Sequence, residues 1–315
     1  MMLSTNKRKN KKQDEIPRGE AKAGTLEEYF KARYSPRSIG NYQGIANRFK
    51  AYMNGQAETA SYTDILGYIG YLRQSKLSPR SIHSHLHVIK VYYRWLVDTG
   101  QRADHPCRGL NLKDQVNKTI AIESLYTTET LENLLQCHEA KNKALQKRNE
   151  CVISLLIYQG LTTQELSALE IDNINLGKGA IYIKAGRSNR SRTLSLKNNQ
   201  VMLFYQYINH DRPMLLSNNK QATKNNIKSL ILSYTGKPIP PGNIRGILNP
   251  RGQNSPKLLP LKIRQSVITH LLKQGHDVRI VQVFAGHRKA ASTEEYKQTG
   301  LEELKTAIQK HHPLG

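Results

Sequence analysis

The sequence predicts a mostly α-helical protein with one small three-stranded antiparallel sheet, divided into two domains. The chain has 315 residues, and a single domain typically has about 150, so we expect two domains, each with its own hydrophobic core. Residues 25–100 place apolar side chains at steps of three and four, the period of a helix with one buried face. Residues 171–196 instead hold short β-prone runs between Gly and polar turns, which indicate strands.

The charge composition indicates a polyanionic partner. The chain has 48 Lys and Arg against 24 Asp and Glu, which gives a formal net charge of +24. A surplus of this size is typical of nucleic-acid-binding proteins, with an unspecific basic surface as the alternative. Three cysteines are too few and too scattered for a disulfide framework or a zinc site. Without a leader-like segment or an apolar run of about 18 residues, we expect a cytoplasmic, nucleoid-associated protein with no membrane contact.

The first hundred residues predict a basic arm followed by helices. Residues 1–24 carry seven Lys and Arg and almost no apolar side chains, which is typical of a flexible arm that contacts phosphates or of a solubilising tail. Thr25 caps the first helix expected after this arm. Two later helices open with the same pentapeptide, Ser-Pro-Arg-Ser-Ile, at residues 35–39 and 78–82. Ser before Pro is a helix-start signal, because Ser caps the helix and Pro fits its first position.

Basic side chains of this helical region are candidates for DNA contact. The candidates are Arg37, Arg80, Lys90 and Arg94. The two arginines lie in first helical turns, beside N–H groups that a helix leaves unpaired and that suit phosphate, although simple capping is the alternative. His83 and His87 also admit a metal pair, but no acidic or Cys ligand lies nearby in the sequence. We therefore expect a DNA-facing stripe and no metal site.

Residues 101–119 are the expected linker, and residues 120–315 the expected second domain. The linker candidate holds Pro and Gly and few periodic apolar residues. A long helix over about 141–159 ends in a nearly all-apolar run, which is typical of a core helix. Gly160 closes it, and Thr162 followed by Glu165 predicts a capping box for a short helix.

The remaining elements alternate between short strands and helices. Strands are expected over 171–176, 180–184 and 193–196, with a basic turn over 186–191. Helices are expected over 198–208, about 222–233, 262–273 and 301–309, with a Pro- and Gly-rich loop over 236–252.

The stretch from residue 284 to 296 concentrates residues that can carry chemistry. An apolar helix end stops at Gly286, a residue type favoured just past helix C-termini, and His287 follows at once. Residues 292–295 predict a new helix with a hydroxyl cap and an acidic first turn. Tyr296 lies on this helix, so we expect it to face the same point as His287.

A Gly-His pair nine residues before a Tyr resembles the last motif of tyrosine recombinases, the phage-integrase and Xer family. The order of elements also resembles that family's catalytic domain: a capped Gly-Leu turn, a sheet with a basic turn, then paired helices ending in Gly-His and Tyr. The helical region in front resembles its core-binding domain. The resemblance implies an all-helical core-binding domain over 25–100, followed by a mixed α/β catalytic domain over 120–315.

The resemblance implies a site-specific DNA recombinase, integrase-like or transposase-like, that cleaves and rejoins DNA through a 3′-phosphotyrosyl intermediate. Its nucleophile would be Tyr296, with Arg264 and His287 as donors to the phosphate. The strand-turn cation would be Arg187, with Lys184 as the alternative. No cofactor is implied, because the phosphotyrosyl bond conserves the energy of the broken phosphodiester.

The resemblance also implies the partners. They are double-stranded DNA and either three further copies of the chain or a related recombinase in a hetero-oligomer, with the helix over 301–309 docked on a neighbour. Arg190 and Arg192, in the basic turn and just after it, would contact DNA.

Two positions depart from the family pattern and leave the catalytic set degenerate. The family's first Arg follows the Gly-Leu pair, where this chain has Thr162. Its first His or Lys precedes the second Arg by three, where this chain has Leu261, with Lys262 one position off. Losing one preorganised donor costs about 100- to 1000-fold in rate.

Three hypotheses follow from these departures. The chain is an active recombinase, an impaired paralogue that binds DNA beside an active partner, or a strand nicker that relaxes DNA with the same Tyr. Basic residues that could replace the missing donors are Arg148, Arg190, Arg192 and Arg288.

Overall fold

The structure, a computed structural model, describes residues 24–115, 120–121, 124–187, 189–219, 227–250 and 257–296. It divides into two compact units that meet in the chain between residues 117 and 118. The basic arm, apart from its last residue, and the helix expected over 301–309 lie outside the described residues.

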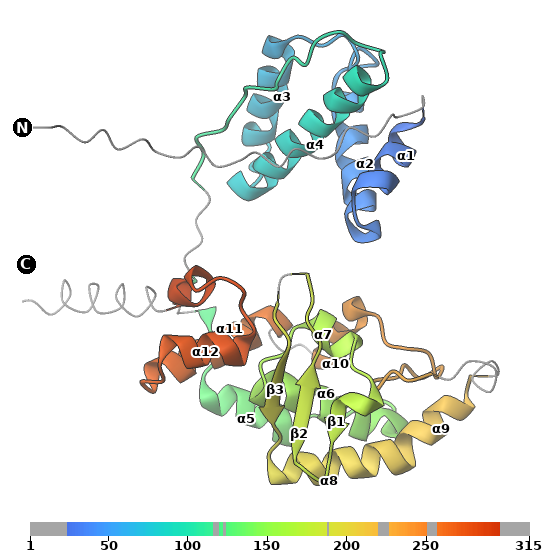
Figure 1. Cartoon of the computed structure of the whole chain (residues 1–315), viewed down its shortest axis with the longest axis vertical. Coiled ribbons are helices and arrows are strands. Elements are labelled where there is room, and N and C mark those ends of the chain that lie inside the picture. The colour runs from blue at the N-terminus through green and yellow to red at the C-terminus, as the bar shows by residue number, and fades with distance from the viewer. Residues whose placement is uncertain are drawn as a thin grey trace, which may run out of the picture. The chain divides into compact units, whose positions relative to one another are not determined.

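The described part of the first unit is all-helical, as predicted. Its helices are α1 (Leu26–Arg33), α2 (Pro36–Tyr52), α3 (Tyr62–Gln74) and α4 (Pro79–Asp98) (Figure 1). The two Ser-Pro openings start α2 and α4, and Ser78 accepts a hydrogen bond from the Ser81 N–H at 3.3 Å. The core is rich in aromatic rings, with Phe30, Phe49 and Tyr93 completely buried. Such rings supply much of the apolar area that a small helical unit needs.

The segment expected as a linker packs onto this first unit over most of its length. Cys107 and Leu110 are buried in the unit's core. Asp114 forms a 2.6 Å ion pair with Arg73 of α3. Little periodicity was visible here because the segment is irregular, and irregular backbone places its apolar side chains at no fixed spacing.

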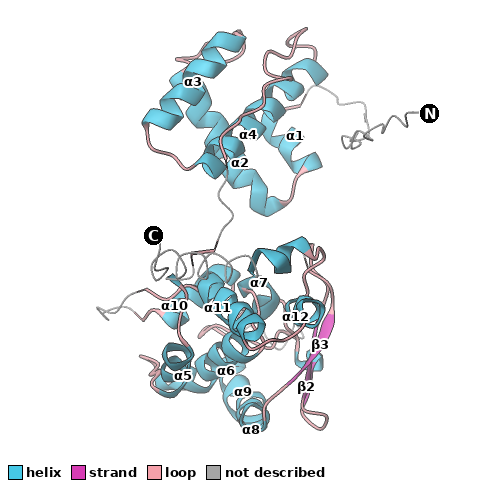
Figure 2. Ribbon diagram, turned by 90° about the vertical axis from the view of Figure 1, so that its left-hand side faces the viewer, coloured by secondary structure: helices cyan, strands magenta, loops and turns pink. Residues whose placement is uncertain are grey.

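The second unit is built around α6 (Gln146–Tyr158), which has a nearly all-apolar end. Residues 151–156 of this helix are all buried, so it lies within the core (Figures 1 and 2). Helices that pack on it are α5 (Thr128–Gln136), α8 (Asn198–Gln206) and α11 (Pro260–Lys273). The predicted long helix is therefore confirmed as a core element, preceded by a short 3₁₀ turn, η2 (Lys143–Leu145).

The sheet of the described residues is antiparallel and three-stranded, in the order β1-β2-β3. Its strands are β1 (Ile174–Asn175), β2 (Ala180–Ile183) and β3 (Arg192–Ser195). Ile183 is paired with Arg192 at the end where the basic turn connects β2 and β3. The first expected strand is shorter than predicted, because residues 171–173 form a 3₁₀ turn, η3 (Ile171–Asn173). The predicted fold class, mostly α with a small antiparallel sheet, is confirmed.

One predicted helix is wrong in the part that the structure describes. Residues 227–233 belong to no helix, and Ser229 instead bridges Glu170 while Leu232 bridges Pro238. A short apolar run such as residues 230–232 cannot be assigned to strand or helix by periodicity alone, and all three residues are buried. Conversely, the expected loop over 236–252 contains a short helix, α10 (Ile244–Leu248), preceded by a 3₁₀ turn, η5 (Pro241–Asn243).

The remaining elements complete the second unit. Helix α8 continues through a π-helical turn, η4 (Tyr207–Asp211), into α9 (Arg212–Ser217). The predicted capping box opens α7 (Thr163–Ser167). Helix α12 (Val278–Ala285) lies beside β3 (Figure 2), which brings the Gly-His pair to the basic turn. Among the described residues, no helix is both long and apolar enough to cross a membrane.

Candidate active site

Gly286 ends α12 in a conformation that only glycine adopts readily. Its φ of +70° is left-handed, as expected just past a helix C-terminus. A Cβ at this position would overlap Nη1 of Arg192 and lie 3.0 Å from the carbonyl oxygen of Arg190. The glycine therefore permits close approach of the strand β3 arginine to the end of α12.

The next residue, His287, lies beside Tyr296. Their rings are stacked, with centroids 6.0 Å apart and planes 21° apart. The Nδ1 atom of His287 is 2.9 Å from Oγ1 of the buried Thr293, which fixes the imidazole. Residues 291–296 are helical and carry Tyr296 over this short distance. The two residues of the Gly-His to Tyr motif thus share one site.

Burial and nearby cations determine the protonation states of this pair. Burial lowers the pKa of His287 to about 4, and the charges of Arg264 and Arg192 act in the same direction. The imidazole is therefore neutral at pH 7. Burial raises the pKa of Tyr296, and the charge of Arg264 partly opposes this effect. The phenol is protonated at neutral pH and would lose its proton only during reaction.

Arg264 connects the ends of two helices. Its guanidinium is buried, with Nη1 donating to the Gly160 carbonyl at 2.5 Å and Nη2 to the Ala285 carbonyl at 2.6 Å. Carbonyl groups at helix C-termini lack intrahelical partners, so a cation there satisfies hydrogen bonds and the helix dipole together. The arginine therefore fixes the end of α6 relative to the end of α12.

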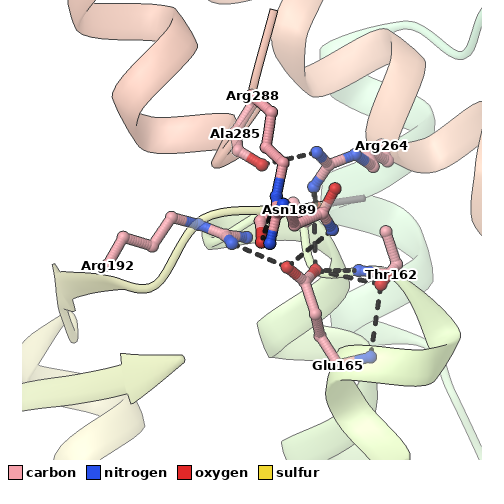
Figure 3. A network of polar contacts seen from close by, with 8 residues as sticks. Thr162, Glu165, Asn189, Arg192, Arg264, Ala285 and Arg288 are labelled. Carbon is pink, nitrogen blue, oxygen red and sulfur yellow. Dashed lines mark hydrogen bonds and ion pairs between the residues drawn. The ribbon is translucent and has the colours of Figure 1, made fainter. Parts of the chain in front are cut away.

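Glu165 of α7 is the shared acceptor of this site (Figure 3). Its Oε2 accepts from the N–H of Thr162 at 2.8 Å and from its hydroxyl at 3.0 Å. Its Oε1 accepts from Asn189 Nδ2 at 3.0 Å and from Arg192 Nη1 at 2.6 Å. Arg264 Nη1 lies 3.9 Å from Oε2.

The carboxyl of Glu165 stays ionised although it is buried. Burial raises its pKa, but the hydrogen bond and charge of Arg192, with the donors of Thr162, outweigh this and hold the pKa below its usual value. The sequence indicated Glu165 only as a capping residue. Its second role depends on a contact with a residue 27 positions away, which no local pattern signals.

The basic turn between β2 and β3 is attached to the Gly-His segment. The Arg190 N–H donates to the Gly286 carbonyl at 2.8 Å, and Asn189 pairs with His287 as an antiparallel bridge. Arg288 Nη2 adds a bond to the Gly186 carbonyl at 2.9 Å. The backbone of this turn is consequently held near His287.

The two candidates for the strand-turn cation differ in their surroundings. Lys184 forms a 2.7 Å ion pair with Glu170 on the surface. Arg187 is exposed and has no hydrogen bond or ion pair with any residue that the structure describes. Its charge is available to a ligand, whereas Lys184 would first have to leave Glu170.

Comparison with known proteins identifies the family. The model of the phage integrase family matches residues 124–302, and the model of the phage integrase N-terminal SAM-like domain matches residues 24–102. The chain belongs to the phage integrase family. Tyrosine recombinase XerC of Halalkalibacterium halodurans is 25% identical over 287 residues, covering 89% of this chain and 92% of that protein. XerC of Anoxybacillus flavithermus is 27% identical, with 89% and 93% coverage.

Two solved structures share the fold at low identity. The XerH site-specific recombinase bound to palindromic difH substrate, in a post-cleavage complex, has a TM-score of 0.62 at 19% identity, covering 89% of this chain and 82% of that chain. The Tn1549 transposon integrase in complex with transposon right end DNA has a TM-score of 0.60 at 15% identity, covering 89% and 96%.

The expected DNA-contacting residues of this integrase-family chain fall into two groups. The first group is exposed or half-buried and consists of Arg37, Arg80, Lys90, Arg94 and Arg190. Arg192 differs, because it is only 5% exposed and is engaged with Glu165. A buried ion-paired guanidinium is not part of the open surface, so DNA contact by Arg192 stays a prediction and would need the site to open.

Neither of the two positions at which we expected a departure from the family pattern holds a cation. Thr162 is the N-cap of α7, and its side chain is occupied by the capping box. Leu261 lies in the first turn of α11 with 64% of its surface exposed. Of the possible replacements, Arg148 binds the Leu232 carbonyl and its neighbour Asn149, away from this site.

The side chains of the site do not form a metal-binding cluster among the described residues. Among the described residues, no group of three or more His, Cys, Asp or Glu side chains could hold a metal ion. The site as described consists of hydrogen-bond donors, one carboxylate and one phenol.

Proposed function

We propose that this chain is a site-specific DNA recombinase that cleaves and rejoins DNA through a 3′-phosphotyrosyl intermediate at Tyr296. The observation that carries the proposal is the stacking of Tyr296 on a neutral His287, with the buried Arg264 close enough to change the pKa of both. A nucleophile beside preorganised phosphate donors is what transfer of a phosphoryl group to a side chain requires.

The chemistry assigns each group a step. The Tyr296 oxygen bonds to phosphorus and its proton passes to solvent, while the bond to the 5′ oxygen breaks and that oxygen takes up a proton, so one proton is released and one is consumed. Arg264 and His287 donate hydrogen bonds to non-bridging oxygens, where negative charge grows. If the Thr293 hydroxyl donates to Nδ1 of the neutral His287, then Nε2–H is left as the donor to phosphate.

The leaving 5′ oxygen needs a proton from the basic turn. Arg187 has a free charge but is a poor acid, because an arginine pKa exceeds about 12. Lys184 is the better acid, and it becomes available only when its exposed pair with Glu170 opens. Arg187 therefore fits stabilisation of charge, and Lys184 fits proton donation.

The proposed partners and location follow from charge and family. Double-stranded DNA fits the +24 net charge. We assign residues 25–100 to core binding, 101–119 to the connection and 120–315 to catalysis, in a homo-tetramer or a hetero-oligomer with a related recombinase. The protein would act in the cytoplasm at the nucleoid.

A second candidate function is that of an impaired paralogue that binds DNA beside an active partner. The side chains of Thr162 and Leu261, where the family pattern has basic residues, favour this second function. Thr162 uses its hydroxyl and N–H for capping, and Leu261 is apolar. Neither can stabilise a phosphate charge, so an isolated chain lacks two donors of the family pattern.

Covalent capture tests the proposal. The protein is incubated with a library of nicked duplexes that carry a randomised centre, and adducts that survive denaturing detergent are isolated and sequenced. A nick beside the cleaved bond lets the short leaving strand diffuse away, which traps the phosphotyrosyl adduct. We expect adducts with a common sequence, which then supplies a defined substrate for gel assays.

Two tyrosine variants interpret the result. Tyr296→Phe should abolish the adduct and leave DNA binding by mobility shift unchanged. Tyr234→Phe removes the hydroxyl of an exposed Tyr in the same unit and should leave the adduct in place. Specific binding of the library without any adduct would reject the enzyme and support the DNA-binding paralogue.

A further inference from the structure

We propose that Arg192 supplies to the phosphate of the cleaved bond the cation that the family pattern places at the position of Thr162. The proposal rests on the proposed function, because it assigns a ligand of the same site. In this role Arg192 extends from β3 to contact the phosphate, and its guanidinium lies next to Gly286.

The guanidinium of Arg192 has one unused edge. Its Nη1 donates to Glu165, whereas Nε and Nη2 are buried and have no hydrogen-bond partner among the described residues. Nε and Nη2 lie along one side of the planar group, the side that binds two oxygens of a carboxylate or phosphate at once. Buried donors are almost always satisfied in folded proteins, so two on one guanidinium call for a ligand.

The position of this edge relates it to the reacting residues. Arg192 lies against Gly286, where even a Cβ would overlap Nη1, and Gly286 is joined to His287. The charge of Arg192 also contributes to the low pKa of His287. The chain therefore holds this cation within the site and not merely near it.

The charges of the cluster leave room for one anion. Arg192 and Arg264 approach the Glu165 carboxylate from different sides (Figure 3). Two guanidinium groups and one carboxylate carry a net charge of +1, and His287 is neutral. A phosphodiester, with a single negative charge, would balance the cluster.

The other arginines named from the sequence lack this combination. Arg148 binds a backbone carbonyl and Asn149 elsewhere in the unit. Arg288 is exposed and donates to carbonyls of the basic turn, and Arg190 is exposed. Among these candidates, only Arg192 is buried at the site with a vacant pair of donors.

Access to this edge requires movement. Nε and Nη2 lie below the solvent-accessible surface, so a phosphate, free or in DNA, reaches them only when the residues around them move. The Arg192 guanidinium lies against Gly286, whose carbonyl accepts the bond from the Arg190 N–H, so the basic turn and the Gly-His segment are the neighbouring backbone that can move.

The first test uses inorganic phosphate and does not depend on cleavage. The melting temperature of the full chain is measured with phosphate and with chloride at matched ionic strength, since a ligand that binds the folded state raises it. We expect a phosphate-dependent rise in the wild type that Arg192→Gln abolishes. Arg212→Gln is the matched control, because it removes another buried guanidinium, whose partners among the described residues are the Ile227 and Ser229 carbonyls. It should keep the phosphate-dependent rise even if its baseline stability falls.

The second test uses the substrate obtained by covalent capture. Arg192→Gln should slow adduct formation by about 100- to 1000-fold, the cost of one lost oxyanion donor. With an uncharged methylphosphonate at the cleaved bond, that deficit should shrink to about tenfold or less, because the charge that needs the cation is gone. Adding Thr162→Arg to Arg192→Gln should restore part of the rate on normal DNA. If Arg192→Gln unfolds, Arg192→Lys carries the test, since it keeps the pair with Glu165 but loses the fork.

The outcomes separate the two proposals. Loss of the phosphate effect in Arg192→Gln, with no adduct from the wild type, supports the Arg192 site and rejects the recombinase. An Arg192→Gln variant that keeps the phosphate effect, or shows the same deficit on phosphate and methylphosphonate DNA, reduces Arg192 to a structural role and overturns the inference.

Discussion

The two sides of the candidate active site differ in how they hold charge. On the side of α11 and α12, the buried Arg264 lies near the stacked rings of His287 and Tyr296. On the side of α7, Thr162 serves as a helix cap and carries no charge. The carboxylate of Glu165 lies between the sides, within 3.9 Å of Arg264 and bonded to Arg192.

This difference shows that a helix without a cation need not leave its side of the site without positive charge. The α7 side has no cation of its own, but β3 brings Arg192 to it from a different part of the chain. The ion pair is buried, so its energy depends on both partners being present. Substitutions on the two sides should therefore change the free energy of unfolding by different amounts and for different physical reasons.

Glu165→Gln should have the largest effect on stability. It removes the charge that two buried arginines share, and breaking a buried pair from one side costs about 3–5 kcal/mol in the free energy of unfolding. Urea unfolding at pH 7 measures the change. Lys184→Gln is the control, because it breaks an ion pair of similar length (2.7 Å) on the surface, and it should shift the urea midpoint barely measurably. Equal shifts for both variants would show that burial contributes nothing to the first pair.

Gly286→Ala should have the next largest effect and tests how closely the two sides approach. The new Cβ would overlap the Arg192 guanidinium and occupy a left-handed φ, for a total of about 2–4 kcal/mol. Gly275→Ala is matched, because Gly275 has a φ of +85° but no atom within 4 Å of a Cβ. It should cost only the backbone strain, about 1 kcal/mol. A cost for Gly286→Ala that equals the control would mean that Arg192 is not confined there.

Most of the fold was predictable because its signals are local. Capping residues, Pro at first helical positions and apolar steps of three and four residues located α2, α4 and α7, and the Gly-His pair located the end of α12. The failure at residues 229–232 was physical, since a short buried apolar run fits a strand as well as a helix. The extent of the packed segment up to Asp114 was also hidden, because it depends on tertiary contacts such as the pair with Arg73.

The candidate site was only half predictable for the same reason. His287 and Tyr296 are close in sequence, so their spacing is informative. The pair of Glu165 and Arg192 joins a helix cap to a strand 27 residues later, and both residues already had a sufficient local explanation. Sequence named Arg192 among four possible replacements, and burial with two vacant donors distinguishes it from the others.

The pH dependence of stability tests the state of His287 on the α12 side. Its pKa is about 4 in the folded chain against about 6.5 when unfolded. The unfolded chain therefore binds the proton first, so this contribution is complete above about pH 6.5 and is lost as the pH falls towards 4. The difference amounts to about 3 kcal/mol. Unfolding of the wild type and of His287→Gln between pH 4 and 7 should converge at the acidic end, and parallel curves would contradict a neutral buried imidazole.

Substitutions at Thr162 and Leu261 should change the free energy of unfolding least, and the two changes should differ from each other. Thr162→Ala removes a capping hydroxyl that is bonded both to the Glu165 N–H and to its carboxylate, at a cost of about 1 kcal/mol. Leu261→Ser changes a side chain that is 64% exposed, so the free energy of unfolding should change by no more than about 0.5 kcal/mol. Thermal unfolding of both variants measures the contrast. A larger cost for Thr162→Ala would mean that Thr162 stabilises the folded protein and that Leu261 does not. A Leu261→Ser variant as destabilised as Thr162→Ala would show instead that the leucine, too, has a packing partner in the folded protein.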